Sequence, residues 1–251
     1  MASVQYHFGA GVLVGTNTAA NSTPQKFGTL QEVSVDMSFD VKRLMGSYQF
    51  PVDVGRAGGK VSGKAKLARV NGRLYNDLFL STTAGVTAGM TLTQDAESGT
   101  IPGTPFQITI APPNSGVFLR DLGVFFAATG LALKRVAATP AVSEYSVNES
   151  TGVYTFNTGD TTKVVYITYD YTIATGYKFT LDNQPMGSVP YFALSLFNSR
   201  NSNGLHIRLN ACVGSKLSFP FTNEDFMKHD FEFEALADSA NVVGVFGFTN
   251  Q

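Results

Sequence analysis

Three histidines and one cysteine are the residues whose types suit metal binding or nucleophilic chemistry. His7, His206 and His229 lie far apart in the sequence, and no two show the spacing of a metal-ligand motif. Distant histidines can converge in a fold, but structural histidines are the more frequent outcome. Cys212 is alone in an apolar stretch, so we expect a buried thiol, and no internal disulfide can form. We therefore predict neither a metal site nor a cofactor.

Two glycine-rich stretches approach phosphate-binding motifs without completing them. Residues 9–15 lack the third glycine of a dinucleotide-binding fingerprint and are not followed by a helical pattern. In residues 55–60 the first glycine is one position too close for a phosphate loop. Val61 also stands where Ser or Thr would hold magnesium. We interpret both stretches as ordinary turns.

Asp36 and Asp40 are the nearest approach to a general acid and base pair. They lie on the polar side of an alternating segment, and nothing in the sequence predicts the burial that would separate their pKa values. A solvated or partner-facing sheet surface explains them better. The search for catalytic residues thus points to a protein that is not an enzyme.

The segment that carries these acids has the clearest secondary-structure signal. Val33, Val35, Met37, Phe39 and Val41 alternate with polar residues, which predicts a strand over 32–42 with one buried and one polar face. Residues 60–69 alternate as a second strand. The intervening residues 45–59, with Pro51 and several glycines, predict a hairpin arm longer than a turn needs and able to reach a neighbour.

The rest of the chain divides into a short helix, a linker and two groups of strands. Residues 71–80 predict a helix after a capping Asn, and residues 222–226 a second helical turn. Residues 81–105, rich in Thr, Gly and Ala, are interpreted as a linker into a block of short strands typical of a small β-sandwich. The strands expected in that block are 106–110, 117–126, 131–137, 152–156 and 163–172. The last third predicts strands at 176–181, 191–197, 206–212, 230–237 and 241–248.

Composition narrows the class of protein. The 251 residues include 20 Phe, 10 Tyr and 25 Gly, which suit pleated sheets joined by tight turns. Only 15% are charged, so we expect partners to cover part of a neutral surface. A net charge of −1 argues against a protein that grips phosphates. With no signal peptide and no bilayer-length apolar run, we expect a soluble protein that folds in a reducing compartment.

Several stretches in this order resemble the major tail tube protein of long-tailed bacteriophages. They are VDMSFDVKRLMGSYQFPV at 35–52, GKVSGKAK at 59–66, NGRLYNDLF at 71–79, LNACV at 209–213, KLS at 216–218, EDF at 224–226, FEFEA at 231–235 and AD at 237–238. The middle block resembles inserts of such proteins through EYSV at 144–147, GVYTF at 152–156 and VVYITYDY at 164–171. Each piece alone is a common strand-and-turn pattern. Their combination over most of the chain carries the resemblance.

The resemblance implies an all-β subunit with an antiparallel β-barrel or sandwich tube domain and an inserted small immunoglobulin-like β-sandwich. Residues 1–98 and 176–251 would form the tube domain, and residues 99–175 an outward-facing module. Copies would close into hexameric rings, stacked into the tube through which the genome passes without sticking. Partners would be further copies, baseplate and tail terminator proteins, and a sheath or tape-measure protein. The location would be the virion tail, with the host cytoplasm during assembly, and no membrane.

Two site hypotheses follow from this family pattern. Residues 44–58, among them Leu44, Met45, Tyr48, Phe50 and Arg56, and the loop 16–26 are expected to contact the next ring. The acids Asp36, Asp40, Glu232 and Glu234 are expected on the channel wall, where they would repel the DNA backbone.

Three alternatives remain open. One is a secretion-system tube of the same fold. Another is a carbohydrate- or receptor-binding β module, suggested by Tyr145, Tyr154 and Tyr169, although core packing explains such residues more often. An enzyme comes last.

Overall fold

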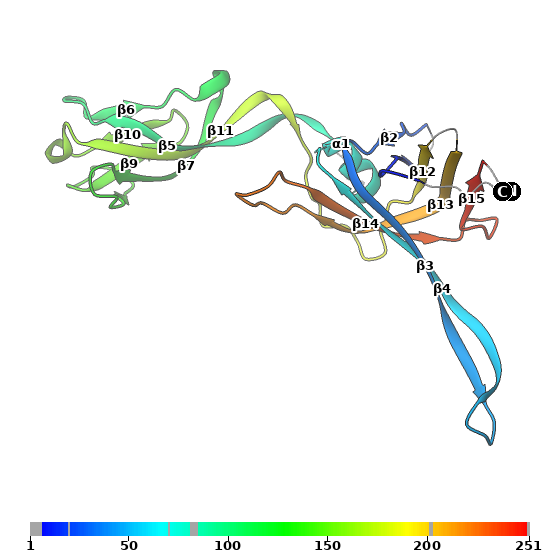
Figure 1. The fold of residues 1–251 in the computed structure, drawn as a ribbon. Helices are drawn as coiled ribbons and strands as arrows, with labels where there is room; N and C mark the ends of the chain where they lie inside the picture. Colours follow the sequence, from blue (N-terminus) through cyan, green and yellow to red (C-terminus); the bar gives the residue numbers. More distant parts are fainter. Residues whose placement is uncertain (1–6, 20, 70, 81–84, 201–202, 250–251) are drawn as a thin grey trace. The chain divides into compact units, whose positions relative to one another are not determined.

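The computed structural model describes residues 7–19, 21–69, 71–80, 85–200 and 203–249. Strands make up 56% of it and helix 6%, which confirms the predicted all-β class. The chain separates into two compact units, coloured along the sequence in Figure 1. Unit 1 comprises Met1–Val86 and Phe179–Gln251, and unit 2 comprises Thr87–Lys178.

Unit 1 is built on one antiparallel sheet in the order β2-β1-β12-β13-β14-β4-β3, with β15 paired to β13. Its strands are β1 Val12–Asn17, β2 Gln25–Lys26, β3 Leu30–Met45, β4 Pro51–Leu67, β12 Phe192–Arg200, β13 Asn203–Ser218, β14 His229–Leu236 and β15 Gly244–Phe248. Within the described residues the sheet stays open, so the barrel form of the expected tube domain is absent.

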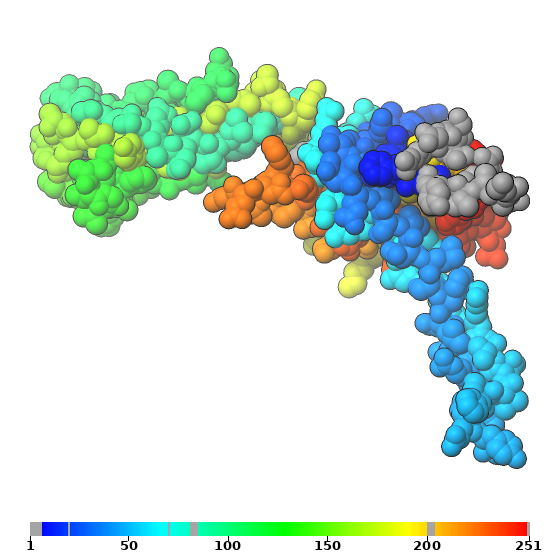
Figure 2. All heavy atoms as spheres, viewed as in Figure 1, coloured from blue at the N-terminus to red at the C-terminus, as the bar shows by residue number. Residues whose placement is uncertain are grey.

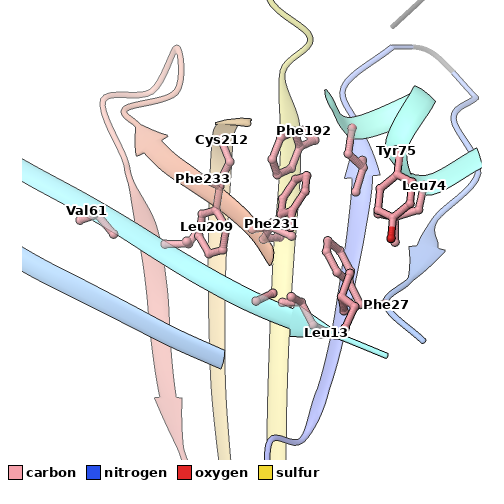
Figure 3. Packing of buried hydrophobic residues seen from close by; sticks show 14 residues of the cluster. Leu13, Phe27, Val61, Leu74, Tyr75, Phe192, Leu209, Cys212, Phe231 and Phe233 are labelled. Atoms are coloured by element: carbon pink, nitrogen blue, oxygen red, sulfur yellow. The ribbon is translucent and has the colours of Figure 1, made fainter. Parts of the chain in front are cut away.

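One face of this sheet carries the core of unit 1. Phe231 and Phe233 of β14 lie at its centre, and Leu74 and Tyr75 of the helical segment lie at one side of it (Figure 3). Leu78 of the same segment belongs to the cluster as well. Because opposite residues of an antiparallel pair share a face, Val61 and Ala65 of β4 join the same cluster. The core therefore lies between the sheet and a single short helical layer.

The helix predicted over 71–80 is confirmed, whereas the turn predicted over 222–226 is wrong. α1 Gly72–Tyr75 continues into a π-helical turn, Asn76–Leu80, and the Asn71 side chain accepts a hydrogen bond from the Leu74 amide at 3.3 Å. Residues 223–225 are only bends. There the Asp225 carboxylate accepts from its neighbour's amide, Phe226 N, at 2.7 Å, a local bond that competes with helix formation.

Unit 2, all of whose residues are described, is a sandwich of two sheets around one core. β6 Gln107–Thr109, β10 Val153–Phe156, β9 Glu144–Asn148 and β8 Lys134–Arg135 form one sheet, and β5 Thr87–Thr100, β11 Val164–Lys178 and β7 Val117–Phe126 form the other. Buried aromatic rings from both sheets, including Phe118, Tyr145 and Tyr169, fill the space between them. The short β8 runs parallel to β9.

The linker expected over 81–105 is wrong for most of its length. Residues 87–100 form β5, which pairs with β11 almost from end to end. Unit 2 therefore begins at Thr87 rather than at 99 and ends at Lys178 rather than at 175. Of the strand expected over 176–181, only residues 176–178 are in a strand, and they form the end of β11. Residues 179 to 191 are irregular.

No helix in the described part of the chain is both long enough and apolar enough to cross a membrane.

Candidate assembly surface

The β3–β4 hairpin continues past the strand that pairs with it. β14 pairs with β4 only from Val61 to Leu67, so residues 51–60 of β4 pair with β3 alone. The outer part of β3, residues 38–45, spans about 25 Å at the rise of an extended strand. This two-stranded extension, together with Asp36 and Met37 at its base, is called the arm here (residues 36–60), and it is the blue-to-cyan hairpin of Figures 1 and 2.

One face of the arm carries exposed apolar side chains. Met37, Phe39 and Val41 alternate along β3 and are 53%, 46% and 47% exposed. Val54 of β4 lies opposite Arg43 and shares their face. The prediction that this whole face is buried is wrong beyond Val35, because no other element of the described chain covers it. Such a contiguous apolar row is typical of a protein-binding surface.

The arm also contains the residues predicted to reach a neighbouring ring. Leu44 and Met45 end β3, and Tyr48 and Phe50 lie in the turn, where both rings are more than 80% exposed. The Arg56 guanidinium carbon lies 5.0 Å from the centre of the Phe39 ring, a cation–π contact that steadies the apolar face. These side chains are thus displayed together. The loop within 16–26 lies between β1 and β2 and is mostly exposed.

A bulge fixes the twist at the foot of the arm. The register shifts between Phe39 and Asp40, where Gly58 adopts a φ of 54°. The positive φ favours glycine at this position, while the Asp40 carboxylate, 2.7 Å from where a Cβ would lie, is the end of an exposed side chain that can rotate away. The stretch 55–60, interpreted from sequence as a turn, is thus a bulged strand within β4. In the other stretch, Gly15 lies within strand β1.

The four acids predicted to line a channel lie on the opposite face of the same sheet. Asp36 and Glu234 both stand opposite Ser62, and Glu232 stands opposite Lys64. Asp40 is two positions further along the same face as Asp36. Whether this face borders a channel depends on an assembly and stays a prediction.

Lysines are interleaved with these acids. Glu234 pairs with Lys60, and Glu232 accepts from Lys216 at 3.3 Å and lies 3.9 Å from Lys64. Asp36 and Asp40 have no ion pair among the described residues. The exposed face is therefore a mixed-charge surface, whereas the sequence predicted a purely acidic one.

The histidines and the cysteine occupy separate places in unit 1. His229 is fully buried among aromatic rings, and His206 hydrogen-bonds Ser195 at 2.8 Å. Burial raises the pKa of the Cys212 thiol to about 12, as expected for an inert core residue. Within the described ranges, no group of three or more His, Cys, Asp or Glu residues is arranged to hold a metal ion.

The tyrosines that suggested a binding face on unit 2 belong to its core. Tyr145, Tyr154 and Tyr169 are at most 2% exposed. Tyr145 and Tyr154 donate to the Asp121 carboxylate at 2.7 and 2.9 Å, and burial is the main cause that raises the pKa of both hydroxyls. A hollow of about 420 Å³ on this unit is lined by small neutral residues such as Ser146 and Thr155. No specific feature of it favours a sugar.

The sequence analysis missed a second exposed aromatic site in unit 1. Phe221 and Phe226, in the loop between β13 and β14, are 83% and 87% exposed. A sequence signal did exist: aromatic residues flank a polar, acidic stretch in a segment without strand alternation.

The chain was compared with protein-family models and with curated proteins. No protein-family model matches the chain. No curated protein matches it either.

Proposed function

We propose that this chain is a structural, non-enzymatic subunit that assembles with copies of itself into the tail tube of a long-tailed bacteriophage. The observation that carries the proposal is the exposed apolar face of the arm. Fully burying such a side chain is worth about 1.5–3 kcal/mol, and covering the exposed half of each gains about half of that, so a row of them favours association over the solitary chain.

The geometry of the hairpin supports contacts between copies. β3 is an edge strand of 16 residues whose outer side has no neighbour among the described strands. An unpaired edge of this length is an aggregation hazard unless a partner covers it. Identical neighbours satisfy such an edge in a ring, and a second, non-closing set of contacts then stacks the rings.

The mixed-charge face supports a conduit that does not hold DNA. Four of its lysines, Lys60, Lys64, Lys66 and Lys216, are paired with acids, so few free cations remain to bind phosphates, and a chain of net charge −1 adds no basic excess. In the proposed tube this face lines the channel, and unit 2 takes the place of the outward module of the resembling proteins.

Electron microscopy of the purified chain tests the proposal. Hollow tubes or stacked rings of uniform diameter are expected, and the same chain should be found by mass spectrometry in purified phage tails. A monodisperse monomer at every concentration would refute self-assembly. Tubes from a chain encoded beside secretion genes would favour the secretion-system alternative.

A further inference from the structure

An apolar groove lies at the foot of the arm, on the core side of the sheet. It encloses about 380 Å³, and we call it the socket. Its lining includes Met37, Phe39, Val61, Leu209, Val243 and Phe246. Val61 and Leu209, which line the socket, belong to the core cluster and lie on the side away from Leu74 and Tyr75 of the helical segment (Figure 3).

The loop that bears Phe221 and Phe226, residues 219–228, lies at the other end of the same strands. It leads into β14 at His229, whereas Leu236 and Ala237, at the far end of β14, line the socket. The eight residues of β14 separate the two features by about 25 Å. One end of the sheet thus presents exposed aromatic rings, and the other end presents an apolar hollow.

Local contacts hold this loop in shape and leave its two phenylalanines outside. The Phe219 ring packs edge-on against Tyr75 and His229, with centroids 5.4 and 5.0 Å apart. At the tip, Asp225 accepts from the Lys228 ammonium at 2.5 Å. The projecting rings are therefore displayed on an anchored loop, which lowers the entropic cost of docking them.

The charges around the two features are complementary. Glu224, beside the exposed rings, is exposed and has no ion-pair partner among the described residues. At the socket, the Arg56 guanidinium lies over the Phe39 ring without a carboxylate partner in the described chain, whereas Lys60 on the wall already pairs with Glu234. An acid arriving with the loop would meet the Arg56 cation.

We propose that the loop 219–228 of one copy docks Phe221 and Phe226 into the socket of the next copy. The proposal rests on the proposed function and names the contact that propagates the assembly. Because the two surfaces differ and lie at opposite ends of β14, the contact is heterologous. It repeats head to tail and does not close on itself as a symmetric dimer does.

Disulfide trapping in the full-length chain tests the contact. Asn223→Cys places a thiol in the loop and Ala237→Cys places one at the socket, and both positions are exposed. The native Cys212 is buried and contributes no background. Under mild oxidation, the double variant should give a covalent ladder of dimers, trimers and longer species on non-reducing gels. A mixture of the two single variants should give dimers only, and each single variant alone should give monomers.

Three other outcomes would overturn the inference. Tubes that form normally but yield no ladder would reject this contact and leave the proposed function intact, whereas a chain that never assembles would reject both. A dimer from Asn223→Cys alone would indicate a symmetric contact instead. As an independent measure, Phe221→Ser with Phe226→Ser should raise the concentration needed for assembly at least about tenfold. The melting temperature of the monomer should be unchanged, since both rings are exposed.

Discussion

Unit 2 and the arm of unit 1 differ in how far their aromatic side chains are buried and their acids are paired. In unit 2 the phenylalanines are buried or half-buried, and the buried acids Asp121, Asp160 and Asp170 all have partners within the unit. The arm has no interior, and every residue from Asp36 to Gly46 is exposed. Unit 2 also exposes aliphatic side chains, among them Leu119 and Leu131, but it has a core of its own. The arm has no core, so its apolar row is covered only when another molecule binds it.

The largest expected effect comes from placing a charge on the arm. Met37→Asp should abolish assembly, because burying an unpaired carboxylate costs about 3 kcal/mol or more, equivalent to a rise of over about 100-fold in the assembly concentration. Sedimentation velocity measures it. Leu119→Asp in unit 2 is the matched control, since Leu119 is 44% exposed against 53% for Met37, and it should assemble normally. If the two variants assemble to the same extent, the proposed difference between the arm and unit 2 is contradicted.

A smaller effect is expected from the buried hydrogen bonds of unit 2. Tyr154→Phe removes one of the two tyrosine hydroxyls that donate to Asp121, whose side chain is only 3% exposed. Leaving this carboxylate short of a donor should lower the free energy of unfolding by about 1–2 kcal/mol. Denaturant unfolding measures it, and Tyr177→Phe, at a ring 75% exposed, should change nothing. Assembly should be unaffected by either variant.

The two units should also differ in their response to mild acid. Burial lowers the pKa of His229 below its usual 6.5. The stability that unit 1 gains from burying the neutral imidazole is therefore complete above about pH 6.5 and is lost as the pH falls below that value. Unit 2 contains no histidine, so its transition should stay constant between about pH 6.5 and 5. His229→Leu should flatten the profile of unit 1, because neither ring nitrogen has a hydrogen-bond partner to lose in the described structure. A wild-type profile that is already flat would contradict this.

The smallest expected effect on assembly comes from removing unit 2 altogether. Thr87 and Lys178 pair at the two ends of the insert, so a short Gly-Ser linker can join Val86 to Phe179. Tubes of unchanged repeat but smaller outer diameter should be visible by electron microscopy. Failure of this shortened chain to assemble, while still folded, would mean that unit 2 supplies a contact.

The sequence predicted the strands whose side chains alternate, and it failed where pairing is non-local. The alternation over 32–42 identified β3, but periodicity shows only that one face needs cover, and it cannot tell whether the same chain supplies that cover. The residues of β5 predict a linker because their Thr, Gly and Ala side chains show no clean alternation, and the strand forms only through pairing with β11.

The candidate site was predictable in part. The length of the arm and the shared face of Asp36, Asp40, Glu232 and Glu234 could be expected from alternation once the strands were known. The lysines that pair with Glu232 and Glu234 depend on register, which single strands do not reveal. The socket depends on five separate segments meeting at one place, so no local pattern could have indicated it.

Hydroxyl-radical footprinting across a dilution series tests most directly whether another copy covers the arm. As the chain assembles, modification of Met37 and Phe39 should fall several-fold, while Leu119 and Leu131 of unit 2 stay as reactive as in the dilute protein. Equal reactivity of Met37 and Phe39 at all concentrations, with or without assembly, would contradict the central claim.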